Sequence, residues 1–132
     1  MTDDIGKLVL RVSLGVLVLL HGIAKLQNGV DGIAGMLAGH GLPSVLAYGA
    51  YLGEVVGPIL VVIGLFTRIG ALLIVCNMLM AFGLAHMQQM FSIASTGGWA
   101  LELQGMYLFG AIAVALLGAG AYSVGGRNGR YN

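Results

Sequence analysis

The chain has 132 residues, of which 58% are hydrophobic and only 8% are charged, and its mean hydropathy is +0.95. A soluble domain carries roughly 25% charged residues, so six basic and five acidic side chains are too few to cover a protein of this size in water. The net charge of +1 excludes the basic surface that nucleic acid requires, and the single cysteine excludes an internal disulfide. The composition predicts one domain, residues 1–132, with the lipid bilayer as its main solvent.

Rare charges and clusters of glycine and proline divide the chain into four apolar stretches. They cover about residues 7–26, 44–66, 68–90 and 99–121. Each is close to the roughly 20 residues with which an α-helix crosses about 30 Å of hydrocarbon, and none alternates in polarity as a membrane strand does. The sequence therefore predicts an all-α fold, a bundle of four transmembrane helices.

The connections between the predicted helices differ in length and character. The second and third helices meet at Thr67 and Arg68, which predicts a tight helical hairpin. The connection 27–43 is the longest, and its apolar residues have the i, i+3, i+4, i+7 spacing of an amphipathic helix: Val30, Ile33, Ala34 and Leu37. We expect it to form a short helix at the membrane interface. Residues 125–132 form a short polar tail.

Lysine and arginine fall unequally on the two sides of this arrangement. One side, which carries both chain ends, has five of them: Lys7, Arg11, Arg68, Arg127 and Arg130. Only Lys25 falls on the other side. Because cytoplasmic loops carry the excess of basic residues, the sequence predicts a multi-pass protein with both termini in the cytoplasm.

Ionisable residues inside a membrane span are costly, and by default they indicate a functional site. Counted at 1.5 Å per residue, the outer half of the predicted bundle holds five of them: His21, Lys25, Glu54, His86 and Glu102. On the first helix, one inward-facing stripe is predicted to carry Arg11, Gly15, Gly22 and Lys25. The sequence thus predicts a polar site in the outer half of the bundle, with Arg11 on the stripe that leads to it.

Glycines on the second helix predict close contacts with another helix. Gly49, Gly53 and Gly57 form a double G-x-x-x-G ladder beside Glu54. Small residues let a second backbone approach closely in lipid, so the ladder predicts contact with a partner protein or a second copy of the chain.

Each polar residue also has a structural interpretation. Lys25 can extend to lipid headgroups, Arg11 can mark the cytoplasmic boundary, and His86 can lie at the interface. Glu102 suits the positive end of a helix dipole. Glu54, near mid-span, must be protonated or paired, so an ion pair that joins two helices is its structural alternative.

Metal chemistry receives weaker support from the sequence. His86 and four methionines (78, 80, 87 and 90) are soft ligands that suit copper, but methionine is also common in apolar cores. No Glu-x-x-His pair is present for a di-iron site. No metal site is predicted.

Several short motifs follow one another along nearly the whole chain. They are R-x-x-x-G and H-G-x-x-K-L in residues 11–26, G-L-P in 41–43, E-x-x-G in 54–57, G-L-F-T-R in 64–68, Glu102 at the start of the last helix, and G-A-G-A-Y-S in 118–123. Their order and spacing resemble those of the DoxX family of small bacterial and archaeal membrane proteins. That family often has an acidic residue after the final Tyr-Ser, where this chain has Val124.

The resemblance implies a four-helix bundle in the bacterial inner membrane. It implies redox chemistry as well, because the family takes its name from a small subunit of a thiosulfate:quinone oxidoreductase. The residues that it carries over as the site are Arg11, His21, Lys25, Glu54 and Glu102.

The function predicted first is a membrane subunit of a quinone-linked redox system. His21 or Lys25 would polarise the quinone carbonyl, Glu54 would relay a proton and Glu102 would complete the catalytic set, while Arg11 and His86 are assigned to quinone binding. No electron carrier is encoded, so a partner or the substrate must bring the electrons. Two alternatives stay open: a small-solute transporter or exporter that is proton-coupled through Glu54, and a non-catalytic assembly subunit.

Overall fold

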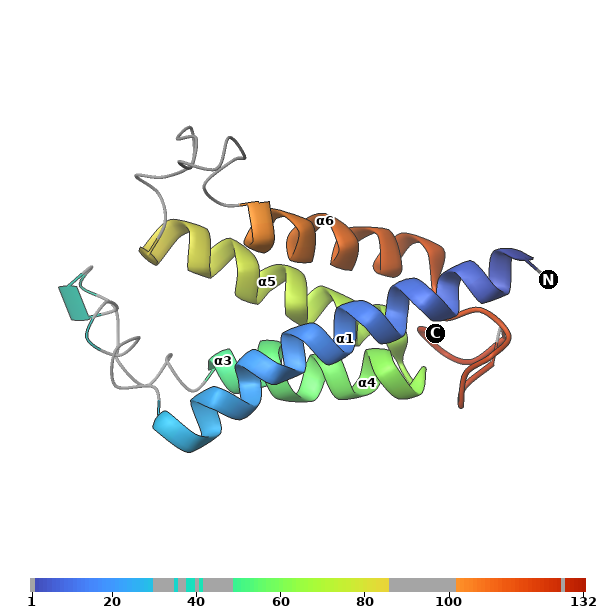
Figure 1. Ribbon diagram of the computed structural model, residues 1–132, viewed down its shortest axis with the longest axis horizontal. Coiled ribbons are helices and arrows are strands. Elements are labelled where there is room, and N and C mark those ends of the chain that lie inside the picture. Colours follow the sequence, from blue (N-terminus) through green and yellow to red (C-terminus); the bar gives the residue numbers. More distant parts are fainter. Residues whose placement is uncertain are drawn as a thin grey trace.

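The structure is a computed structural model that describes residues 2–29, 35, 38–39, 41, 49–85, 102–126 and 128–132. The regular elements of this part of the chain are all helical, which confirms the predicted all-α class (Figure 1). They are α1 (Thr2–Asn28), α3 (Gly49–Tyr51), η2 (Leu52–Val56), α4 (Gly57–Ile63), α5 (Thr67–Ala85) and α6 (Glu102–Leu117). Because α3, η2 and α4 follow one another without a break, the described part contains four helical rods.

The four rods run alternately in opposite directions along the bundle (Figure 1). The rod of α1 packs against α4 and α6, and α5 packs against the same two neighbours, so the rods surround a common core. All four contribute to that core: Leu14, Val18, Val61, Ala71, Ile74, Met78, Tyr107, Leu108, Ala111 and Val114. Both chain ends lie at the same end of the bundle, which we call the terminal end; Thr2, Ile63, Thr67 and Leu117 mark it.

The first hairpin, α1 with α4, is closed at the terminal end by Arg11. The last carbonyl groups of a helix have no partner within the helix and need an external donor. Arg11 lies on α1, is 1% exposed, and donates from Nη1 to the carbonyl oxygens of Val61 (2.9 Å) and Val62 (3.0 Å). One residue after α4, Gly64 takes a left-handed conformation with φ of 76° and ends the helix.

The second hairpin, α5 with α6, is capped by an arginine in the same way. Arg68 at the start of α5 donates from Nη1 to the carbonyl oxygens of Ala115 (3.1 Å) and Leu116 (3.2 Å). One residue after α6, Gly118 is left-handed with φ of 81°. In both hairpins an arginine on the first helix therefore caps the same two positions at the end of the second helix, a feature that the sequence analysis did not predict.

Residues 118–126 and 128–132 fold back against the terminal end. The amides of Val124 and Gly125 donate to the carbonyl oxygens of Ile63 (3.1 Å) and Gly64 (2.9 Å), which completes the capping of α4. Asn132 Oδ1 accepts hydrogen bonds from the amide and the hydroxyl group of Thr67 (3.1 and 2.8 Å). The segment predicted as a polar tail is thus an integrated part of the fold.

The second rod widens into the π-helical turn η2 just before Pro58. A proline has no N–H and its ring clashes with the carbonyl four residues back, so the α-helical bond from Pro58 to Glu54 cannot form. The amide of Gly57 instead bonds five residues back, to Leu52. The apolar stretch 44–66 predicted one membrane-spanning helix, and the proline explains the π-helical turn within it.

The membrane-crossing potential of the helices is unequal. The segment Thr2–Ala24 of α1 is long and apolar enough to span a bilayer, whereas the apolar segments Leu52–Ile63, Thr67–Met80 and Gly105–Leu117 are shorter. The fourth predicted stretch was expected to reach residue 121, but the left-handed Gly118 ends α6 at Leu117. The predicted interfacial helix in 27–43 lies largely outside the described residues.

Candidate functional site

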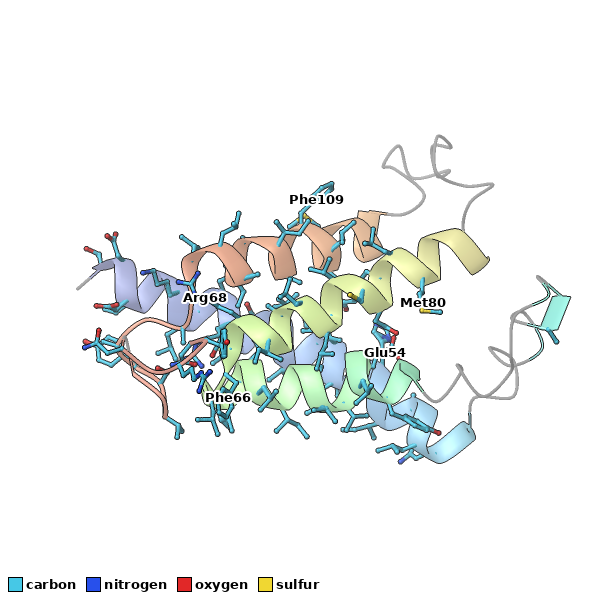
Figure 2. The ribbon with its side chains drawn as sticks, turned by 180° about the vertical axis from the view of Figure 1, so that it is seen from behind. Glu54, Phe66, Arg68, Met80 and Phe109 are labelled. Atoms are coloured by element: carbon cyan, nitrogen blue, oxygen red, sulfur yellow. The ribbon has the colours of Figure 1, made fainter. Side chains whose placement is uncertain are left out.

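Glu54 is a buried carboxylic acid in the middle of η2. Its side chain is 5% exposed and lies inside the bundle, between the ribbons of η2 and α5, whereas Phe109 stands on the outer side of α6 (Figure 2). π-Helical turns are rare and occur frequently at functional sites, because the extra residue displaces a side chain from the regular register. The depth of Glu54 in its apolar stretch marks it as a predicted site residue, whereas the unusual backbone that presents it was not predicted.

Gly22 brings α1 against the backbone of Glu54. A Cβ atom added to Gly22 would overlap the Glu54 carbonyl oxygen, so only a residue without a side chain fits there. The neighbouring His21 therefore lies at the same level of the bundle as Glu54. The two residues that the sequence placed in one site do belong to helices in direct contact at this level.

His21 is hydrogen-bonded to Tyr107 of α6. The distance from His21 Nε2 to Tyr107 Oη is 3.3 Å, and the two rings meet edge to face with centroids 5.6 Å apart and an interplanar angle of 66°. Tyr107 is 7% exposed and belongs to the core, while His21 is exposed on the outside of the bundle. The pair thus links the core to the outer surface.

Asn77 of α5 lies at the same level of the bundle as Glu54. Gly53 packs directly against its Cβ atom, and a Cβ at Gly53 would overlap it. Gly57 continues this contact, since a Cβ there would lie 2.8 Å from the carbonyl oxygen of Gly70. Two members of the glycine ladder therefore contact α5 of the same chain. Gly49 is exposed, and among the described residues no atom lies within 4 Å of a Cβ added there. The predicted contact with a second chain stays a prediction.

Sequence reasoning missed Tyr107 and Asn77. Tyr107 and Asn77 are polar groups within apolar stretches, as Glu54 is. However, the site prediction rested on ionisable groups, whose burial is the most costly. A hydroxyl or amide can be buried more easily when it finds a hydrogen-bond partner. The partner of Tyr107 lies 86 residues away in the chain, so no local pattern indicates the pair.

The structure does not describe the side chains of three other predicted site residues. Lys25 belongs to α1 one turn beyond His21, and Glu102 is the first residue of α6, but the side chains of both lie outside the described part of the structure. His86 follows α5 and also lies outside it. Their membership of the site stays a prediction.

Arg11 lies apart from the other predicted site residues. It is ten residues before His21 on α1, about 15 Å along the helix axis, and it is engaged at the terminal end. In addition to Val61 and Val62 it binds the carbonyl oxygen of Tyr122 at 2.5 Å. The structure therefore gives Arg11 a capping role and does not bring it together with Glu54; the predicted part in quinone binding is not tested.

Glu54, His21, Tyr107 and Asn77 lie at one level of the bundle, and we call these four residues the Glu54 cluster. An exposed imidazole can donate a hydrogen bond to a ligand or accept one from it, and a carboxyl group is a chemical type that can transfer a proton. Within the described residues, no group of three or more His, Cys, Asp or Glu side chains converges as a metal site would require.

Comparison with known proteins relates the chain to one family. The sequence profile of the DoxX family matches residues 6–87, more than half of the chain and the part that holds His21 and Glu54. The chain is 42% identical over 66 residues to the protein named "Putative oxidoreductase CatD" of Bacillus subtilis (strain 168). That match covers 50% of this chain and 48% of the relative, so it spans about half the length of each. No solved structure matches the chain.

Proposed function

Because the chain belongs to the DoxX family, we propose that it is a multi-pass protein of the bacterial inner membrane and the membrane subunit of a quinone-linked redox system. The observation that carries this proposal is the position of buried Glu54 at the level of the His21–Tyr107 pair, whose imidazole is exposed on the outside of the bundle. A quinone dissolved in the bilayer could reach such a group without entering the core. The name of the relative from Bacillus subtilis, which describes an oxidoreductase, supports the redox part.

Exposed apolar side chains support a bilayer around all four rods. Each rod carries large apolar residues on its outer side, among them Leu20, Ile59, Leu72 and Leu116. Soluble proteins rarely expose continuous apolar patches larger than a few hundred Å². The rod α5, with 19 residues, is about 28 Å long, close to the hydrocarbon thickness.

The donors at the cluster suit a quinone. A quinone carbonyl is an acceptor, and the His21 ring has one nitrogen engaged with Tyr107 and makes no other hydrogen bond in the described part of the chain. Its second nitrogen can therefore serve a ligand. In our proposal His21 binds the quinone carbonyl and Glu54 carries the proton. Lys25 and Glu102 lie toward the end of the bundle opposite the terminal end. A partner protein brings the electrons.

The distribution of basic residues supports a cytoplasmic terminal end. Lys7, Arg11, Arg68 and Arg130 lie on segments at that end, together with both chain ends (Figure 1). The excess of lysine and arginine faces the cytoplasm in membrane proteins. In this orientation the Glu54 cluster lies in the outer half of the bilayer.

Quinone binding tests the proposal directly. The full chain would be purified in mild detergent, its extracted lipids analysed for quinone by mass spectrometry, and its affinity measured for a short-chain benzoquinone and a short-chain naphthoquinone. We expect bound quinone, and we expect His21→Gln to weaken binding about tenfold, as the loss of one hydrogen bond of about 1.4 kcal/mol would. The control is Ser13→Ala, an exposed residue of the same helix whose hydroxyl bonds to the carbonyl oxygens of Val9 and Leu10 in that helix.

A second assay tests the role of Glu54. Membranes that contain Glu54→Gln should bind quinone but lose quinone-dependent electron transfer. If neither His21→Gln nor Glu54→Gln affects binding or electron transfer, the redox proposal is wrong. The non-catalytic assembly subunit would then be favoured, since the contacts of Gly22, Gly53 and Gly57 show a closely packed bundle.

A further inference from the structure

We infer that Tyr107 is a positioning residue that holds neutral His21 in the tautomer with its proton on Nδ1. The inference rests on the proposed function only for the identity of the ligand. It starts from the contact between Tyr107 Oη and His21 Nε2 at 3.3 Å, and from the different environments of the two groups.

Tyr107 is fixed by its surroundings. It is 7% exposed and is part of the core cluster that includes its neighbour Leu108 and Ala111, one turn further along α6. His21 Nε2 is the hydrogen-bond partner of its hydroxyl group within the described residues. The phenol cannot turn to water for a replacement.

The direction of the hydrogen bond follows from this burial. A phenol carries one hydrogen, and if His21 Nε2 carried a proton as well, the phenol oxygen would have to accept and its own hydrogen would stay buried without an acceptor. An unsatisfied buried donor is unfavourable, so Tyr107 donates and Nε2 accepts. In neutral imidazole the proton then resides on Nδ1.

The consequence is a defined donor on the outer surface. The Nδ1–H of His21 is available on an exposed side chain, and it suits an acceptor such as the carbonyl oxygen of a quinone. The opposite tautomer would offer Nδ1 as an acceptor and would bind a hydroxyl-bearing ligand instead. Tyr107 thereby determines which kind of ligand atom His21 recognises, without touching the ligand itself.

Nitrogen NMR of the full chain tests the inference without any ligand. The protein would be labelled with ¹⁵N-histidine and measured in nanodiscs at alkaline pH, so that free imidazoles are neutral, and the His21 signals identified by their loss in His21→Gln. We expect a protonated Nδ1 and an unprotonated Nε2. A protonated Nε2, or equal amounts of the two tautomers, would overturn the inference.

Variants of the two tyrosines provide the matched comparison. In Tyr107→Phe, the population ratio of the Nδ1-protonated to the Nε2-protonated form of His21 should fall by about tenfold. This factor corresponds to the loss of one hydrogen bond. Tyr122→Phe is the control, because Tyr122 is 45% exposed and uses its main-chain carbonyl rather than its hydroxyl in the contact with Arg11. An unchanged ratio in Tyr107→Phe contradicts the inference.

Quinone affinity separates this inference from the proposed function. If His21 has the expected tautomer but no quinone binds, the proposed function fails and the positioning role stands. If quinone binds to a protein whose His21 carries its proton on Nε2, the positioning role fails and the proposed function stands.

Discussion

The main-chain carbonyl of Glu54 lies in direct contact with Gly22 on the neighbouring helix. Pro58 removes the amide that would bond to this carbonyl in an α-helix, and Gly22 leaves the space into which η2 packs. Two residues on different helices thus determine together how close α1 comes to the buried carboxylic acid.

Substitution of Gly22 tests this contact. Gly22→Ala should force α1 and η2 apart and lower the free energy of unfolding by about 1–3 kcal/mol, as overpacking in a core does. Thermal unfolding in detergent measures the effect. Gly6→Ala is the control, since Gly6 lies on the same helix and no atom of the described residues is within 4 Å of an added Cβ. Alanine at Gly6 should stabilise the protein by roughly 0.5–1 kcal/mol, and a similar gain at Gly22 would refute the close contact.

Replacement of the proline tests the origin of the π-helical turn. Pro58→Ala restores an amide four residues after Glu54, so we expect a new hydrogen bond to the Glu54 carbonyl and an α-helical second rod. The ¹³C shift of the Glu54 carbonyl should change. Ile59→Ala, at an exposed position of the same helix, should leave it unchanged. An identical shift in Pro58→Ala would mean that the turn has another cause.

The two capping arginines should differ in their contribution to stability. Arg11→Gln loses charged hydrogen bonds to three carbonyls from a site that is 1% exposed, and we expect a loss on the order of 3 kcal/mol. Arg68→Gln, at an exposed position, should lose about 1 kcal/mol. Hydrogen exchange of the Val124 and Gly125 amides should accelerate in Arg11→Gln, because Arg11 also holds Tyr122. Equal losses for the two variants would contradict this ranking.

The buried hydroxyl of Thr67 should matter for the attachment of the C-terminal segment. Thr67→Val removes the 2.8 Å hydrogen bond to Asn132 Oδ1 at nearly constant volume, and we expect it to cost about 1–2 kcal/mol. Ser13→Ala removes an exposed hydroxyl and should change the stability by less than about 0.5 kcal/mol. Chemical denaturation in mixed micelles compares the two, and a neutral Thr67→Val would indicate that this contact is not maintained in solution.

The sequence predicted the helical class and the positions of the rods well, because apolar stretches between rare charges leave few other solutions in lipid. It also predicted the tight hairpin at Thr67. It did not predict η2, since the proline indicates a disturbed helix but not its form. Nor did it predict that Gly53 and Gly57 would contact α5 of the same chain.

A site residue could be predicted when it was an ionisable residue within a single apolar stretch, because its burial is costly wherever the other helices lie. Glu54 met this condition, and its burial agrees with the reasoning that selected it. The contact of His21 with Tyr107 depends on the packing of α1 with α6, and the position of Arg11 depends on where α4 ends. Such contacts are set by the tertiary structure, so a search along one helix at a time does not find them.

Because the two hairpins end in the same way, a residue in one can be compared with the residue at the same distance from the end of the other. Glu54 stands ten residues before the left-handed Gly64, and Leu108 stands ten residues before the left-handed Gly118. Leu108 is buried and is an apolar residue of the core. Counted from the two left-handed glycines, the first hairpin carries a buried carboxylic acid where the second carries a buried leucine, so the acid is not part of what the two hairpins share.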